Sequence, residues 1–177
     1  MKSTASENTV KSHHSNNYQV YNTLILALLI MLFVYAASSK ILDYDESRHQ
    51  MLNQVFPKPI SLILLWLVPI TELLISLMIC IKKTRLIGLY AYLATMFAFT
   101  VYIILVMNGI FGRIPCSCGG AIDTLSWKAH LMLNIVFILL TLLSIMFTKK
   151  ENKSKKNLAS KKRKPVSRKQ ADKDAAL

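Results

Sequence analysis

Two cysteines separated by a single residue, Cys116 and Cys118, are the side chains of this sequence best suited to chemistry. They lie in the segment PCSCGG at residues 115–120. A disulfide between residues i and i+2 closes a small ring whose dihedral preferences are hard to satisfy together. Strained, exposed disulfides exchange readily with other thiols instead of acting as structural links. The spacing therefore favours a redox-active dithiol.

Two other interpretations of this pair stay open. Cys116, Cys118 and His130 form a reasonable partial ligand set for a soft metal such as Zn²⁺ or Cu(I). A purely structural disulfide is the third interpretation, although a bridge over one intervening residue constrains almost no chain. The redox interpretation needs no metal site.

Polar side chains elsewhere in apolar surroundings are candidates to support the thiols. His130 can take up or deliver the proton that thiol exchange moves, and Asn134 follows it one helical turn later. Glu72 interrupts an apolar stretch and needs a partner, for which Lys40 and Arg113 are the candidate cations. Each polar residue also has a purely structural interpretation. Glu72 could be a protonated packing residue, and His130 a satisfied residue at the membrane interface.

Four apolar blocks must position these residues. The chain has 177 residues, is 53% hydrophobic and has a mean hydropathy of +0.39, which excludes an ordinary soluble domain. Blocks near residues 20–38, 60–81, 86–110 and 127–148 each approach the length that spans a bilayer. The sequence therefore predicts an all-α, integral membrane four-helix bundle over residues 20–148, in contact with the lipid bilayer.

The charge distribution predicts how the bundle is oriented. Of the net charge of +13, most comes from the tail, where residues 149–174 hold twelve Lys or Arg against three acids. We expect this tail to contact anionic lipid and not nucleic acid. Basic segments stay in the cytoplasm, and both this tail and the turn at residues 82–85 are basic. Because the chain crosses the membrane four times, both termini are expected on the cytoplasmic side. The loops at 39–59 and 111–126 then face the other, oxidising side, and Cys80 faces the reducing side.

The remaining segments have simple expected structures. A polar leader at residues 1–19 and the basic tail at 149–177 are expected to be disordered and cytoplasmic. The loop before Pro57 is expected to hold a short amphipathic surface helix, with Met51-Leu52 and Val55-Phe56 on its apolar side. Lys40, which ends the first block, is expected to reach toward the lipid headgroups.

The order of these motifs resembles the MauE branch of the DoxX-like four-helix membrane proteins. The resemblance covers residues 24–147 and is carried by AASSK ending at Lys40, by Pro69-x-x-Glu72, by the PCSCGG segment, and by Ser126-Trp127 with His130 and Asn134. Its most specific part is the stretch from the cysteines to His130. A plan of four helices with an outer-face dithiol also resembles the vitamin K epoxide reductase type. That type, however, has CxxC and a second cysteine pair, which are missing here.

The resemblance implies a function in disulfide handling at the bacterial inner membrane. MauE proteins are associated with methylamine utilisation and with maturing a disulfide-rich periplasmic subunit beside a thioredoxin-like partner, and DoxX-like relatives are linked to sulfur oxidation with quinone. Carried over, Cys116 and Cys118 would be the redox pair of a thiol–disulfide or quinone oxidoreductase. Lys40, Glu72 and His130 would be its supporting positions. The alternative is a non-enzymatic assembly factor or a soft-metal-binding chaperone.

Overall fold

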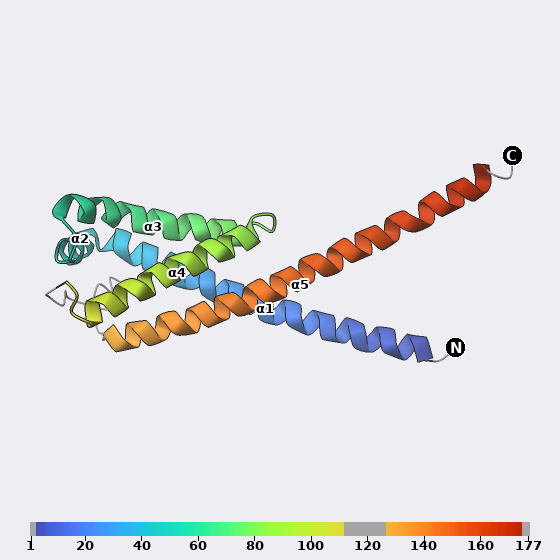
Figure 1. The fold of residues 1–177 in the computed structure, drawn as a ribbon, viewed down its shortest axis with the longest axis horizontal. Helices are drawn as coiled ribbons and strands as arrows, with labels where there is room; N and C mark the ends of the chain where they lie inside the picture. The colour runs from blue at the N-terminus through green and yellow to red at the C-terminus, as the bar shows by residue number, and fades with distance from the viewer. Residues whose placement is uncertain (1–2, 112–126, 175–177) are drawn as a thin grey trace.

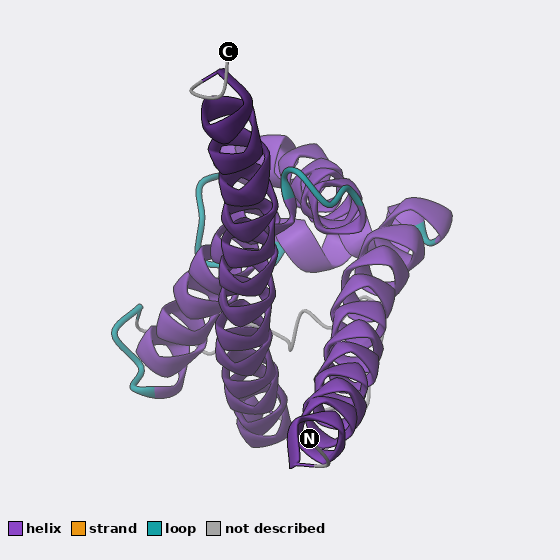
Figure 2. Ribbon diagram, turned by 90° about the vertical axis from the view of Figure 1, so that its right-hand side faces the viewer, coloured by secondary structure: helices purple, strands orange, loops and turns teal. Residues whose placement is uncertain are grey.

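The computed structural model describes residues 3–111 and 127–174 of the chain. Within these ranges it contains five helices and no strand (Figure 2): α1 (Ser3–Leu42), α2 (Tyr44–Leu52), α3 (Lys58–Cys80), α4 (Arg85–Met107) and α5 (Trp127–Asp174). The predicted all-α fold is therefore confirmed. Cys116, Cys118 and Arg113 lie outside the described residues.

Four of the helices are long and apolar enough to cross a membrane. The candidate spans are Tyr18–Leu42, Lys58–Cys80, Arg85–Met107 and Trp127–Asn157, and each contains an 18-residue window of mean hydropathy 2.0 or more. Large apolar side chains cover their outer faces, for example Met31, Phe97 and Met132, which are 64%, 62% and 70% exposed. Such apolar faces suit contact with lipid. A helix can lie in lipid because it satisfies its own backbone hydrogen bonds.

The four long helices form a closed ring in which α1 and α4 each contact both α3 and α5. Figure 1 shows the α3–α4 hairpin beside one half of α1 and α5, which cross each other and continue past the hairpin. Both termini leave the bundle at the end opposite α2 (Figure 1). One end of the bundle therefore carries α2 and the start of α5, and the other carries the α3–α4 turn.

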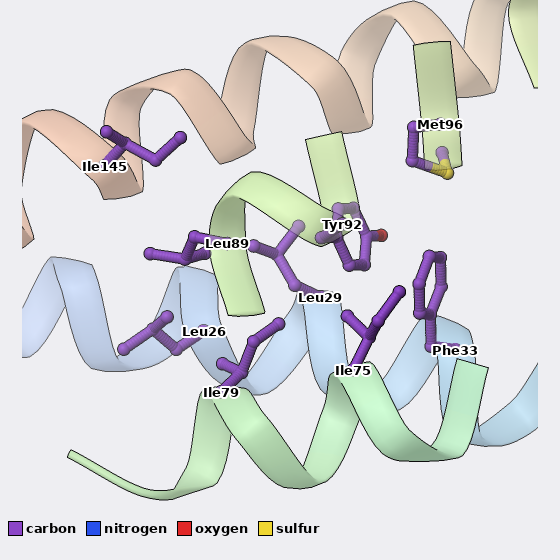
Figure 3. Packing of buried hydrophobic residues seen from close by; sticks show 9 residues of the cluster. All are labelled: Leu26, Leu29, Phe33, Ile75, Ile79, Leu89, Tyr92, Met96 and Ile145. Carbon is purple, nitrogen blue, oxygen red and sulfur yellow. The ribbon is translucent and has the colours of Figure 1, made fainter. Parts of the chain in front are cut away.

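The tightly packed core fills the half of the bundle next to the α3–α4 turn. All four long helices contribute to it (Figure 3), with Leu26, Leu29, Phe33, Ile75, Ile79, Leu89, Tyr92, Met96 and Ile145. At its centre the rings of Phe33 and Tyr92 stack with centroids 4.0 Å apart. The core therefore holds all four long helices together at the end of the bundle that carries the α3–α4 turn.

The α3–α4 turn is closed by two side chains that cap the last turn of α3. Thr84 donates its hydroxyl to the carbonyl of Met78 at 2.9 Å, and Arg85 donates Nε to the carbonyl of Ile79 at 3.2 Å. Helix ends leave such carbonyls without intrahelical partners. The tight turn brings Gly88 against α3, where a Cβ at position 88 would lie 3.0 Å from the backbone nitrogen of Ile79.

We expect Gly88→Val to destabilise the protein by about 1–3 kcal/mol, the usual range for overpacking a tight contact. The atoms at 3.0 Å from such a Cβ are the backbone nitrogen and Cγ1 of Ile79 and Cβ of Met78, and neither the backbone nor a Cβ can move aside without shifting α3. The measurement is the free energy of unfolding in mixed micelles. Ala94→Val is the control, since Ala94 lies on an exposed side of the same helix; equal stability of the two variants would contradict the expectation.

The segment before α3 differs in detail from the expected surface helix. The helix is present as α2, but it ends at Leu52, so Val55 and Phe56 follow it instead of forming its apolar face. Its buried residues are Ser47 and Gln50. The third predicted span, residues 86–110, also ends earlier than expected: α4 stops at Met107, and Gly109, two residues later, has a φ of 68°. Glycine adopts this left-handed conformation easily and often terminates a helix.

Helix extends through both terminal segments that are predicted from their polar composition to be disordered. α1 begins at Ser3 and α5 continues to Asp174, and both project from the bundle as single helices (Figure 1). Single polar helices without tertiary contacts are only marginally stable in water. The division into a disordered leader (1–19), a membrane domain (20–148) and a disordered tail (149–177) therefore stays a prediction.

Candidate functional site

A cavity of about 390 Å³ occupies the half of the bundle next to α2 and the start of α5. Its wall is formed by the four long helices, by the end of α2 and by the segment that follows α2. The lining residues are Leu32, Phe33, Ala36, Lys40, Met51, Gln54, Phe56, Leu64, Val68, Glu72, Thr95, Met96, Ala98, Phe99, Tyr102, His130, Leu133 and Asn134. Three predicted site residues, Lys40, Glu72 and His130, are therefore brought together.

Lys40 and Glu72 form an ion pair in this cavity. The Lys40 ammonium donates to both carboxylate oxygens, at 3.1 and 3.2 Å, and to the carbonyl of Ala36 at 3.1 Å. The two side chains are only 19% and 11% exposed. An ammonium has three N–H donors, so each can have an acceptor here. The predicted cationic partner of Glu72 is thus Lys40.

The direction of the Lys40 side chain corrects one expectation. The sequence predicts that Lys40 reaches toward the headgroups, but it bends back along α1 to the carbonyl of Ala36, four residues earlier. Side chains on a helix lean toward its N-terminus, and α1 arrives at the cavity with its C-terminal end. A lysine at that end therefore points into the bundle, where Glu72 compensates its charge.

His130 and Asn134 lie one turn apart at the start of α5 and both line the cavity. The His130 ring meets Phe99 edge-on, with centroids 6.2 Å apart and an angle of 85°. Its Nε2 is buried and has no hydrogen-bond partner within the described residues. Asn134, which is 2% exposed, donates to the hydroxyl of Thr100 at 3.4 Å and links α5 to α4.

Aromatic rings, which were not among the predicted site residues, form a row along one side of the cavity. Phe56 stacks on Tyr102 at 5.5 Å, Tyr102 on Phe99 at 6.4 Å, and Phe99 continues to His130. The Tyr102 hydroxyl also donates to Oε1 of Gln54. A signal was available in the spacing of Phe99 and Tyr102, which places them on one helix face.

A second buried polar cluster, which was not predicted either, joins α1 to α5 in the half of the bundle next to the α3–α4 turn. Ser144 donates to Oδ1 of Asn22 at 2.8 Å, and Asn22 donates to the hydroxyl of Thr148 at 3.3 Å. All three side chains are buried, at 0–4% exposure. Such hydrogen bonds specify how membrane helices pair. None of the three residues lines the cavity, so the cluster fixes how α1 and α5 are aligned and is not part of the candidate site.

The thiols are the part of the predicted site that the structure leaves undescribed. Cys116 and Cys118 belong to residues 112–126, while Cys80 is exposed at the end of α3. Among the described residues no group of three or more His, Cys, Asp or Glu could hold a metal ion. The alternative soft-metal set of Cys116, Cys118 and His130 has two of its three members outside the described ranges.

The sequence of this chain matches a known protein family. The family model described as methylamine utilisation protein MauE matches residues 18–147, which is more than half of the chain. The chain belongs to the MauE family. The broader DoxX-like relationship is not part of this match. No curated protein and no solved structure matches the chain.

Membership of the MauE family agrees with the architecture. The matched residues begin with the first candidate span at Tyr18 and continue into α5, so they include every cavity residue named above. This MauE-family chain is accordingly a multi-pass membrane protein linked to methylamine utilisation. The first 17 residues and the basic tail after residue 147 lie outside the match.

Proposed function

We propose that this MauE-family protein exchanges thiols and disulfides on the extracytoplasmic face of a bacterial inner membrane, through Cys116 and Cys118. The observation that carries the proposal is the convergence of His130 with the Lys40–Glu72 ion pair in one cavity. His130 is the fourth residue of α5, directly after the connection that holds the thiols. A proton-accepting ring and a fixed ion pair thus lie at the end of the bundle from which that connection leaves.

The orientation of the bundle is part of the proposal. The α3–α4 turn contains Lys82, Lys83 and Arg85, and the basic tail leaves the bundle at the same end as that turn. Positively charged segments remain on the cytoplasmic side. The cavity end, with α2 and the start of α5, then faces the periplasm. Cys80, in contrast, lies beside the basic turn at the cytoplasmic end.

The reaction requires one thiolate and one disulfide at each step. A thiolate of Cys116 attacks a client disulfide, forms a mixed disulfide and releases the client's other sulfur as a thiolate. Cys118 then attacks the mixed disulfide, so that the client leaves as a dithiol and Cys116–Cys118 is oxidised. The reverse sequence transfers a disulfide to the client. Its rate depends on the thiolate fraction of the attacking cysteine.

The cavity residues have distinct roles in this proposal. His130 accepts the thiol proton, because a neutral imidazole can take up a proton near neutral pH. Lys40 and Glu72 compensate each other's charge, and their role is to hold α1 and α3 together at the cavity end of the bundle. The partner is a periplasmic thioredoxin-like protein or a disulfide-rich client. A lipid-soluble quinone is the acceptor that the resemblance implies for re-oxidation, taking up two electrons and two protons to become a quinol.

The first test is a redox titration of Cys116 and Cys118 in membranes. Membranes containing the Cys80→Ser variant are equilibrated in thiol buffers of different potential, and alkylation then counts free thiols by mass. We expect a reversible two-electron couple whose reduction potential lies well above about −300 mV. Inert structural disulfides lie below that value. The Cys116→Ser/Cys118→Ser double variant is the blank.

Two results would contradict the redox proposal. A disulfide that resists every buffer down to that potential would indicate a structural bridge. Thiols that stay reduced and become alkylatable only after a chelator is added would indicate the soft-metal alternative, and with it a metal-binding chaperone.

A further inference from the structure

The cavity differs from an ordinary packing defect in its size and its lining. Its volume of about 390 Å³ lies within the usual range of small-molecule sites, which is roughly 300–1,000 Å³. Aliphatic and aromatic side chains form most of its wall, and the row of Phe56, Tyr102 and Phe99 supplies ring faces and edges. Such a surface favours a flat apolar ring, which can stack against the aromatic side chains.

The electrostatics of the cavity favour an uncharged occupant. Lys40 is already paired with Glu72, and its ammonium has acceptors for all three of its protons. An anionic ligand would therefore compete with Glu72, and a cationic one would compete with Lys40. Either charge would also lose its hydration in an apolar space, which is costly unless it finds a partner. A neutral molecule avoids both penalties.

One polar atom of the lining still lacks a partner among the residues that the structure describes. Nε2 of His130 is buried without a hydrogen bond, whereas Tyr102, Thr95 and Asn134 each donate to a protein oxygen. Buried polar groups are nearly always hydrogen-bonded, so such an atom calls for an occupant. An imidazole nitrogen can donate or accept, depending on its tautomer.

We propose that the cavity binds an uncharged, flat, lipid-soluble ring compound carrying a hydrogen-bonding oxygen, with the ring along the aromatic row and the oxygen at His130. The ligand reaches its site from the bilayer or the interface. A quinone such as the acceptor proposed above belongs to this class of ligand, so the inference deepens that part of the proposed function, while the binding itself does not require Cys116 or Cys118. It is therefore tested with Cys116 and Cys118 both replaced by serine, so that its failure and the failure of thiol exchange can be told apart.

The test uses 2-naphthol as the probe, since its hydroxyl can donate to or accept from either tautomer of His130. The purified full chain in neutral detergent micelles is titrated, and binding is followed by naphthol fluorescence with empty micelles as the blank. We expect saturable binding at one site per chain. Its affinity should exceed that of naphthalene by about three- to tenfold, the effect of one net hydrogen bond, after correction for partition into micelles. The anionic 2-naphthoate should bind more weakly than 2-naphthol.

Matched variants locate the site. His130→Phe should remove the advantage of 2-naphthol over naphthalene while keeping naphthalene binding, because it preserves a ring and deletes the nitrogens. Ala36→Phe should abolish saturable binding by filling the cavity, whereas Val34→Phe, on an exposed face of the same helix, should not. Ala98→Phe fills the cavity from α4 and replaces Ala36→Phe if that variant fails to fold.

Three results would overturn the inference. The first is binding that rises linearly with probe concentration and so reflects partition alone. The second is saturable binding that survives both Ala36→Phe and Ala98→Phe. The third is a preference for 2-naphthol that is unchanged in His130→Phe.

Discussion

Replacing Glu72 by glutamine is expected to lower the free energy of unfolding by about 3 kcal/mol, at the lower end of the range for breaking a buried ion pair. The carboxylate accepts two hydrogen bonds from Lys40, and both side chains are largely removed from solvent. The variant leaves the Lys40 ammonium in an apolar cavity without a counter-charge. The measurement is unfolding in mixed micelles, followed by helical circular dichroism.

The double variant Lys40→Met/Glu72→Gln separates the ion pair from other roles of Glu72. Removing both charges avoids the unpaired ammonium, so most of the lost stability should return, as is common when buried pairs are replaced by neutral groups. Glu151→Gln is the matched control, because it breaks an exposed pair with Lys155 on one helix. Its cost should stay below about 0.5 kcal/mol. A Glu72→Gln variant as stable as this control would contradict an ion pair that stabilises the bundle.

Replacing Cys118 by serine is expected to trap the client on Cys116. If Cys118 resolves the mixed disulfide, its loss leaves the intermediate without an intramolecular attacking thiol. A covalent adduct should accumulate in cells, appear on non-reducing gels and disappear on reduction, and it should be nearly absent from the wild type. Mass spectrometry of the adduct then identifies the partner.

Two controls make the trapping experiment specific. The adduct must persist in a Cys80→Ser background, since Cys80 is an exposed thiol that could form adventitious disulfides. It must be lost in Cys116→Ser/Cys118→Ser. An adduct formed equally well by Cys116→Ser would mean that either cysteine can attack and that the assigned order is wrong. No adduct in any variant would count against exchange with a protein partner.

The fold class and the number of spans were predictable because hydrocarbon imposes a strict rule on the backbone. Without water to satisfy its polar groups, a spanning segment must be a helix of about 20 apolar residues, which hydropathy detects directly. The four candidate spans Tyr18–Leu42, Lys58–Cys80, Arg85–Met107 and Trp127–Asn157 follow from that rule. Helix ends were harder, because α4 stops at a local backbone feature, the positive φ of Gly109.

The sequence by itself also identified Lys40, Glu72 and His130 as polar residues out of place in apolar surroundings, since burying a charge or imidazole requires a partner. Only the tertiary structure decided which partner each one has. Lys40 meets Glu72 because α1 packs on α3 with its C-terminal end at the cavity, and His130 meets the aromatic row through the rotation of α5 against α4. The cavity itself depends on how the helices are rotated and aligned against one another. Hydropathy does not encode that alignment, because lipid-facing and core-facing positions alike are mostly apolar.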